Sequence, residues 1–183
     1  MYANPTKAKE QRYRAFDHSH TLGKITDVFD SQIYRDLLGR KVVVDRKILP
    51  HKYFSDPRDI ALGLSTDGFG PFKRHKATAW PLILFNYNLP PEIQFNKDNR
   101  IGLGTIPGPN KPIDFNSYFW PAFQEFVHLQ YRVRAFDVLG NKSFLLHAYL
   151  LLVFGDIPAV SIVMRMTGHN GFSPCHMCKI LGV

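Results

Sequence analysis

The amino-acid sequence predicts a mixed α/β fold, and three observations support this prediction. Stretches at 59–66, 79–87 and 100–106 are rich in apolar residues and each is closed by a turn signal, which is typical of strands. The segment 114–130 instead has apolar side chains three or four residues apart, which predicts a helix. An apolar run at 144–154 then supplies further strand material. With 45% hydrophobic and 14% aromatic residues, the 183-residue chain can build a core.

The N-terminal third gives the weakest signals. Residues 1–20 carry charge and aromatic side chains with little periodicity, so we expect a loose arm there. Apolar residues recur at helical spacing between 24 and 39, and Gly39 supplies a stop, which predicts short helices. The stretch from 40 to 58 holds two prolines and many charges. It is expected to be a connector, with room for a short strand at 42–44.

The middle of the chain predicts an antiparallel meander. Large apolar residues alternate with small ones over 60–65, and the Asp67-Gly68 pair that follows predicts a turn. The stretches 79–87 and 100–106 are closed by turns that contain proline. Three strands joined by short turns favour antiparallel pairing.

A helix and more strand material follow the meander. The helix at 114–130 begins with Asp114 near its N-cap. Strand material is expected at 132–138 and 144–154, on either side of a Gly-Asn pair, although the first part of the second stretch could also be helical. A last helix is expected at 159–166, with a proline in its first turn.

Charge and targeting signals narrow the class of partner. Lys and Arg number 23 against 15 Asp and Glu, a net charge of +8 that favours a polyanion such as nucleic acid over a small-molecule substrate. The same excess can also be a solvated surface. The N-terminus lacks the apolar region of a secretory signal, so we expect an intracellular protein. The run 144–154 is about half as long as a membrane span, so no membrane is expected as a partner.

Two acidic residues stand at expected strand ends. Asp67 follows the first strand, Asp156 follows the apolar run, and both precede a chain reversal. Strand ends hold side chains rigidly in a shared cleft, as a site for two divalent cations requires, and carboxylate oxygens suit Mg²⁺ or Mn²⁺. Each residue also has a purely structural interpretation, because Asp-Gly is a common turn pair and Asp156 can cap the next helix.

Four sequence blocks then carry a resemblance to a known family. In order they are TDGFGPF, NLPP, IPGP, and the block that runs from GDIPA to CHMC. From about Ile25 to the last residue the chain resembles the core of CACTA-type (En/Spm) transposases, particularly the forms found in fungal genomes. The resemblance implies an incomplete ribonuclease-H-like fold, in which the meander is followed by a helix, further strand material and a helix. An N-terminal helical or irregular extension precedes it.

The resemblance also implies a chemistry. The family is similar to DDE recombinases, in which three acidic residues hold two metal ions that promote DNA cleavage and attack of the freed 3′ hydroxyl on target DNA. Asp67 matches the first acid and Asp156 the second, 89 residues later. Residues 157–183 contain no Asp or Glu, and the family places its third acid beyond the cysteine pair. We therefore expect a fragment of the catalytic domain that is inactive alone.

The two cysteines, Cys175 and Cys178, match a Cys-x-x-Cys pair that the family completes with two histidines much further on. They are expected to begin a zinc-binding insertion whose site is incomplete, since the only local histidines are His169 and His176. A pair of thiols without metal is the other interpretation. Their close spacing in a reducing compartment argues against a disulfide scaffold.

A basic cluster follows the first acid. Lys73, Arg74, His75 and Lys76 are expected to contact the DNA phosphate backbone, which would give affinity without sequence specificity. A solvated loop is the alternative. Other cationic side chains could add to the positive electrostatic potential that attracts DNA. They are Arg12, Arg14, Arg40, Lys41, Arg46 and Lys47.

These inferences divide the chain into four expected regions. They are a basic flexible arm (1–23), a helical region and connector (24–58), a partial ribonuclease-H-like core (59–168) and the start of the zinc-binding insertion (169–183). Nuclear localisation is expected, and the resemblance implies an oligomer for the full-length family. A non-enzymatic DNA-binding or zinc-knuckle protein is the main alternative. A redox role for the cysteines is a poorer one, because they do not open a helix directly after a strand.

Overall fold

The computed structural model describes residues 1–70, 78–108, 114–164, 166 and 171–172. The chain forms two compact units. Unit 1 consists of Met1–Gly63, Phe85–Arg100 and Phe123–Leu151, and unit 2 of Leu64–Leu84, Ile101–Ala122 and Leu152–Val183. Both contain helices and strands, which confirms the mixed α/β class.

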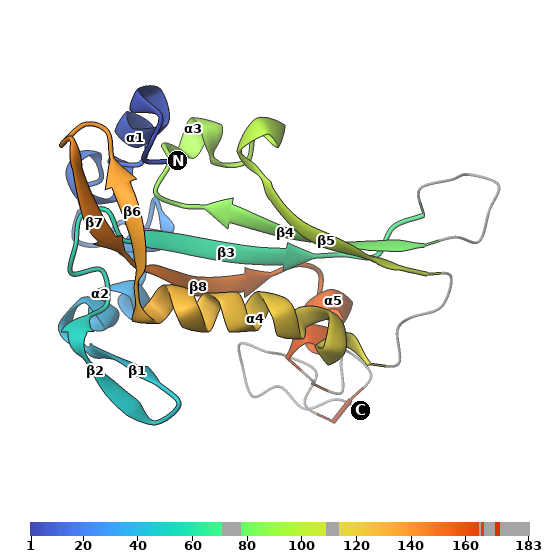
Figure 1. The fold of residues 1–183 in the computed structure, drawn as a ribbon. Helices are drawn as coiled ribbons and strands as arrows, with labels where there is room; N and C mark the ends of the chain where they lie inside the picture. The colour runs from blue at the N-terminus through green and yellow to red at the C-terminus, as the bar shows by residue number, and fades with distance from the viewer. Residues whose placement is uncertain (71–77, 109–113, 165, 167–170, 173–183) are drawn as a thin grey trace. The chain divides into compact units, whose positions relative to one another are not determined.

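A four-stranded sheet has the order β5-β4-β3-β8 (Figure 1). Its strands are β3 (Ile60–Thr66), β4 (Ala79–Asn86), β5 (Ile101–Pro107) and β8 (Ala148–Phe154). β4 and β5 pair antiparallel, with Trp80 opposite Ile106. The amide of Tyr87, just after β4, donates to the carbonyl of Ala61 near the start of β3, as antiparallel strands require. The predicted meander is therefore confirmed.

β8 runs parallel to β3. The amide of Ile60 at the start of β3 donates to the carbonyl of His147, which directly precedes β8, over 2.9 Å. Figure 1 shows the two arrows pointing in the same direction. Parallel neighbours need a long crossover connection, and α4 (Phe115–Tyr131) lies within it. The helix predicted at 114–130 is thus confirmed, and Asp114 accepts a hydrogen bond from the amide of Asn116 (3.0 Å) at its start.

The N-terminal residues of unit 1 differ from the expected loose arm. They form α1 (Pro5–Glu10) and a π-helical turn (Tyr13–Asp17). Arg14 is buried, and its guanidinium donates to the Tyr34 hydroxyl and to the carbonyls of Asp56 and Pro57 at 2.9–3.1 Å. The sequence pattern missed this packing because the groups that satisfy Arg14 lie 20 to 43 residues away.

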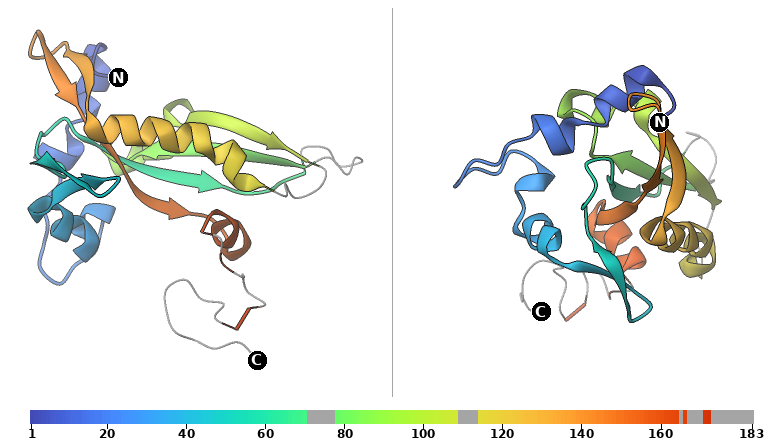
Figure 2. Two further views of the ribbon diagram at one scale, coloured as in Figure 1. Left: turned by 60° about the horizontal axis from the view of Figure 1, so that its bottom comes forward. Right: turned by 60° about the vertical axis from the view of Figure 1, so that its left-hand side comes forward.

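The helices predicted between 24 and 39 are present as a 3₁₀ turn (Val28–Asp30) and α2 (Gln32–Gly39). The connector that follows holds two strands where one was foreseen. β1 (Lys41–Val44) and β2 (Lys47–Lys52) form an antiparallel hairpin (Figure 2). Asp45 and Arg46 join them with positive φ angles of 48° and 65°. This conformation most often holds Asn-Gly or Asp-Gly, and because the second residue here is Arg, the turn was not recognised from the sequence.

The apolar run at 144–154 is divided between two sheets. Its first part belongs to β7 (Lys142–Leu146), which pairs antiparallel with β6 (Val133–Asp137) in unit 1, and its second part is β8. His147 lies between the two strands, and its buried imidazole contacts Asp59. The remaining elements are α3 (Pro91–Gln94), a 3₁₀ turn (Lys97–Asn99) and α5 (Ile157–Val163), which confirms the last predicted helix.

The core of unit 2 packs the first part of α4 against the sheet. Leu64, Leu82 and Ile106 are buried on three neighbouring strands, and Phe115 and Phe119 of α4 are buried as well. Burial of such side chains stabilises by about 1.5–3 kcal/mol each. This packing fixes the strand ends that carry the candidate site. Across the described part of the chain, no helix is long and apolar enough to cross a membrane.

Candidate functional site

The two candidate acids lie directly after neighbouring parallel strands. Asp67 follows β3 and Asp156 comes two residues after β8. Because parallel neighbours end at the same edge of a sheet, the ends of these strands lie together in unit 2. Their backbones are in close contact: a Cβ atom built on Gly155 would lie 3.0 Å from the carbonyl oxygen of Thr66. Each of these two residues directly precedes one of the aspartates.

Asp156 also caps the helix that follows it, as the structural interpretation of the sequence predicted. Its Oδ1 atom accepts a hydrogen bond from the amide of Ala159 over 2.7 Å, so it is the N-cap of α5. Capping uses one acceptor position, whereas an ionised carboxylate offers about four. The residue is exposed. The cap therefore fixes the orientation of the carboxylate and leaves it able to bind a second group.

Asp67 is held on both sides by strand pairing. β3 ends at Thr66, and Phe69 then pairs with Ala79 through two hydrogen bonds of 2.9 and 3.0 Å. The predicted reversal at Asp67-Gly68 is therefore wrong, since pairing resumes beyond it. The side chain of Asp67 is exposed, and its backbone is restrained between the β3 ladder and this bridge.

Gly68 is required by the packing of Trp80. A Cβ atom at position 68 would lie 2.5 Å from the indole ring, closer than side chains tolerate. The same ring contacts Phe115 of α4 edge to face, with centroids 5.4 Å apart. The residue after Asp67 is thus locked to the core of unit 2 through Trp80, and this connection limits movement of the carboxylate.

The donor set at these strand ends consists of oxygen atoms. The hydroxyl of Thr66 is not part of this donor set, because the Thr66 side chain is buried whereas the next side chain, Asp67, is exposed on the other side of the strand end. Oxygen ligands suit Mg²⁺ and Mn²⁺ better than softer metals. Among the described residues no three His, Cys, Asp or Glu side chains converge.

The other predicted site residues lie outside the described residues. Lys73, Arg74, His75 and Lys76 fall within 71–77, and Cys175 and Cys178 within 173–183. Their roles in contacting phosphate and holding zinc remain predictions.

The sequence did not reveal a second polar centre, in unit 1. Asp59 is fully buried and its Oδ1 atom lies 3.0 Å from Nδ1 of His147, while the His147 ring stacks on His51 with centroids 4.1 Å apart. Both histidines line a cavity of about 380 Å³, together with Tyr131 and Arg132. In the sequence, the one indication of this centre was His147, which interrupts the apolar run 144–154.

The contacts fix the tautomers of the neutral rings. A carboxylate only accepts, so His147 carries its hydrogen on Nδ1, and His51 carries its hydrogen on Nε2, which lies 3.1 Å from the carbonyl of Gln130. Burial, and after it the neighbouring His147, lower the pKa of His51 below its usual value.

Asp59 also connects this centre to the start of β3. Its Oδ2 atom accepts from the amide of Asp56 (3.0 Å), and its carbonyl accepts from the side-chain amide of Asn88 (2.8 Å). Asn88 in turn accepts from the amide of Ala61 (3.0 Å). A fully satisfied buried network of this kind specifies one backbone arrangement. Its role here is to position the N-terminal end of β3.

Comparison with known proteins identifies one family. The model of a family described as transposase family tnp2 matches residues 41–181, well over half of the chain. Comparisons with curated proteins and with solved structures give no match.

Proposed function

Because this chain belongs to the transposase family tnp2, we propose that it contributes part of a DDE-type catalytic core for metal-dependent DNA cleavage and strand transfer. The observation that carries the proposal is the contact between Thr66 and Gly155, which joins the strand ends bearing Asp67 and Asp156. The sequence blocks described above favour the CACTA-type, fungal branch of such enzymes.

The strand arrangement supports a ribonuclease-H-like core. Three antiparallel strands occur in the order β5-β4-β3, and the strand after a long helix joins β3 in parallel. The family resemblance implies a meander, a helix and a fourth strand between the two acids, and the order of elements in the chain agrees with this. We propose that the insertion of β6 and β7 between α4 and β8 is an addition to that core.

In this proposal the two aspartates hold Mg²⁺ or Mn²⁺. We propose that the two exposed carboxylates lie close enough to share a cation. They would then repel each other and a DNA phosphate in its absence, and a divalent cation between them relieves both repulsions. When bound, such a cation acts as a Lewis acid on the phosphodiester and lowers the pKa of water. The protein contributes orientation: the α5 cap fixes Asp156, and the Trp80 packing restrains the backbone at Asp67.

The candidate ligands in this sequence are two aspartates, since residues 157–183 contain no Asp or Glu. We propose that this polypeptide binds DNA and metal without cutting DNA, that Cys175 and Cys178 contribute to a zinc site, and that the protein acts in the nucleus. The cluster from Lys73 to Lys76 is proposed to contact the phosphate backbone.

One observation favours a second function. Asp156 has a complete structural explanation as a helix cap, so the fold would keep this residue even without chemistry. A DNA-binding protein derived from a transposon, with no catalytic metal, is therefore the alternative.

A DNA-binding titration with and without Mn²⁺ separates the two functions. If the aspartates hold a cation that faces DNA, Mn²⁺ increases the affinity of the natural protein for duplex DNA and has little effect on Asp67→Asn combined with Asp156→Asn. Equal affinities with and without Mn²⁺ in both proteins would favour the alternative. Nicking of supercoiled DNA that disappears in Asp67→Ala would show that the polypeptide is catalytically complete.

A further inference from the structure

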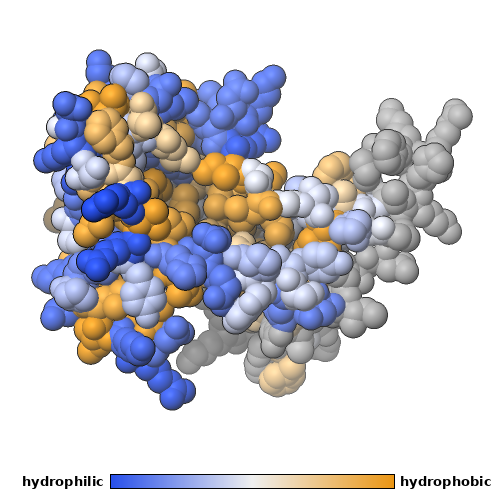
Figure 3. All heavy atoms as spheres, viewed as in Figure 1, coloured by the Kyte–Doolittle hydropathy of each residue, from blue (hydrophilic) through white to orange (hydrophobic). Residues whose placement is uncertain are grey.

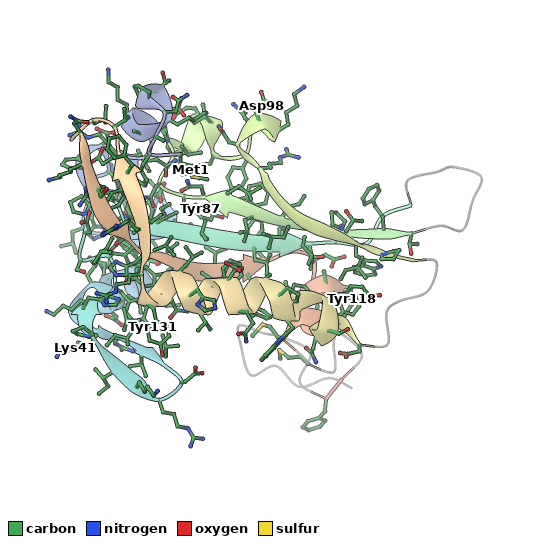
Figure 4. The ribbon with its side chains drawn as sticks, in the orientation of Figure 1. Met1, Lys41, Tyr87, Asp98, Tyr118 and Tyr131 are labelled. Carbon is green, nitrogen blue, oxygen red and sulfur yellow. The ribbon has the colours of Figure 1, made fainter. Side chains whose placement is uncertain are left out.

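The β1–β2 ribbon of unit 1, residues 40–52, concentrates positive charge. It has five cationic side chains and one acidic one, a net +4 in thirteen residues of a chain whose net charge is +8. All five are exposed, and none has a carboxylate partner within 4.0 Å among the described residues. They are Arg40, Lys41, Arg46, Lys47 and Lys52. In Figure 4, Lys41 is labelled where the ribbon begins.

The register places two of these charges directly opposite each other. Lys41 pairs with Lys52, and Val43 pairs with Ile48. Like charges that face each other across two strands destabilise a sheet, because their side chains lie within about 5.5 Å at Cβ. An isolated hairpin is itself only marginally stable. The pair Lys41 and Lys52 is therefore expected to weaken the hairpin, and an anion bound near both ammonium groups would relieve the repulsion.

The same outer face also exposes apolar side chains. Val43 is 50% exposed and Ile48 is 70% exposed, as a cross-strand pair beside the lysines. Figure 3 shows hydrophilic residues around a smaller hydrophobic area at the lower left, where Figure 1 places the ribbon. A surface with cationic side chains around a small apolar area suits a partner that has anionic groups at its edges and less polar groups between them.

The inner face anchors the ribbon. Val42 and Val44 are buried at 0% and 5% exposure, β2 contacts α2, and His51 stacks on His147. The outer face is consequently presented on a rigid support, so binding would not require the ribbon to order. The right-hand view of Figure 2 shows the two strands as one continuous ribbon with its turn at the end.

We propose that the β1–β2 ribbon is a DNA-binding element that lies in a groove of duplex DNA. A major groove about 12 Å wide admits a two-stranded ribbon. Lys41 and Lys52 would contact phosphates, while Val43 and Ile48 face the floor of the groove. The inference rests on the proposed DNA function, and it places a contact surface away from the two aspartates and from residues 73–76 in the sequence.

The test measures the binding of the full chain to a duplex of arbitrary sequence by fluorescence anisotropy, in EDTA and at several salt concentrations. Lys41→Gln combined with Lys52→Gln is compared with a control of equal charge loss, Lys9→Gln combined with Lys97→Gln, at exposed positions outside the ribbon. The ribbon variant is expected to bind roughly tenfold more weakly, and its slope of log Kd against log salt to fall by about 2. In the control, smaller changes are expected in both the affinity and the salt slope.

Two further readouts complete the test. The melting temperature of the ribbon variant is expected to be unchanged or higher, because a like-charge pair is removed. Ile48→Ser is expected to weaken binding with an unchanged salt slope, since no charge is lost. Equal losses in the ribbon variant and the control would overturn the ribbon proposal while DNA binding itself stands. Failure of the natural chain to bind DNA would overturn both proposals, whereas Asp67→Asn with Asp156→Asn is expected to bind normally in EDTA.

Discussion

The carbonyl oxygen of Thr66 lies against the backbone of Gly155, at 3.0 Å from the position that a Cβ atom would occupy. This contact joins the ends of β3 and β8, which are far apart in the sequence, and it sets the positions of Asp67 and Asp156. A side chain at position 155 would require the neighbouring backbone to shift by a few tenths of an ångström. The spacing of the two acids therefore depends on a residue with no chemistry of its own.

Substitution of Gly155 tests this dependence. Gly155→Ala is expected to push the two strand ends apart by a few tenths of an ångström, at a cost of about 1 kcal/mol. We expect a fall of several degrees in the melting temperature and weaker Mn²⁺ binding. Gly104→Ala on β5 is the control, because nothing lies within 4 Å of its Cβ position. Equal effects of the two substitutions would contradict the importance of the Thr66 contact.

Two substitutions of Asp156 separate its structural role from its proposed ligand role. Asp156→Ala removes the cap of α5 and is expected to lower the free energy of unfolding by about 1 kcal/mol. Asp156→Asn keeps a capping oxygen, so its stability in EDTA is expected to stay near that of the natural protein. Both are expected to lose Mn²⁺ binding. Urea denaturation with and without Mn²⁺ measures the difference, and an Asn variant still stabilised by Mn²⁺ would exclude the ligand role.

Gly68→Ala is expected to displace Trp80. A methyl group there would lie 2.5 Å from the indole, so the ring has to move away from its edge-to-face contact with Phe115. The expected result is a shift in tryptophan emission and a lower melting temperature. The emission of Trp80 is obtained by comparison with Trp80→Phe, in which Trp120 is the remaining tryptophan. An unchanged emission spectrum in Gly68→Ala would contradict the packing described.

The stacked histidines predict a pH dependence of stability. The pKa of His51 is lowered in the folded state by burial and by His147, so the unfolded chain binds this proton at higher pH than the folded chain does. The contribution of the neutral His51 ring to stability is complete above the pKa of histidine in the unfolded chain, about 6.5. It is lost as the pH falls towards the lowered pKa of His51 in the folded chain. We expect the melting temperature to decrease between pH 7.5 and 5.5.

His51→Gln keeps a donor for the carbonyl of Gln130 and removes the titrating ring. The pH dependence in this range is expected to become shallower. Asp56, whose pKa is lowered by its hydrogen bond to Arg58, loses its contribution below about pH 4 and so acts in a separate range. A profile that is identical in the natural protein and in His51→Gln would show that His51 does not titrate as described.

Local sequence patterns predicted part of this fold. β3, β4, β5 and α4 follow from alternation and helical spacing, which are properties of neighbouring residues. The β1–β2 hairpin was missed because its turn places Asp45 and Arg46 in the left-handed region, which residue type does not signal.

Long-range pairing could not be predicted in the same way. His147 is 88 residues from Asp59, and Arg14 finds its partners 20 to 43 residues away, so neither burial is visible in a local window. Asp67 and Asp156 were identified from their positions after strands. That their strand ends meet depends on the parallel pairing of β3 with β8, which only the topology supplies.

Direct titration of Mn²⁺ into the protein by calorimetry tests the central claim, that Asp67 and Asp156 together hold a divalent cation. With two carboxylates as the charged ligands, we expect weak binding, with a Kd on the order of 10⁻⁴–10⁻³ M. Asp67→Asn and Asp156→Asn are each expected to weaken it at least tenfold while the melting temperature in EDTA is retained. Equal Mn²⁺ affinity in the natural protein and in both variants would contradict the claim.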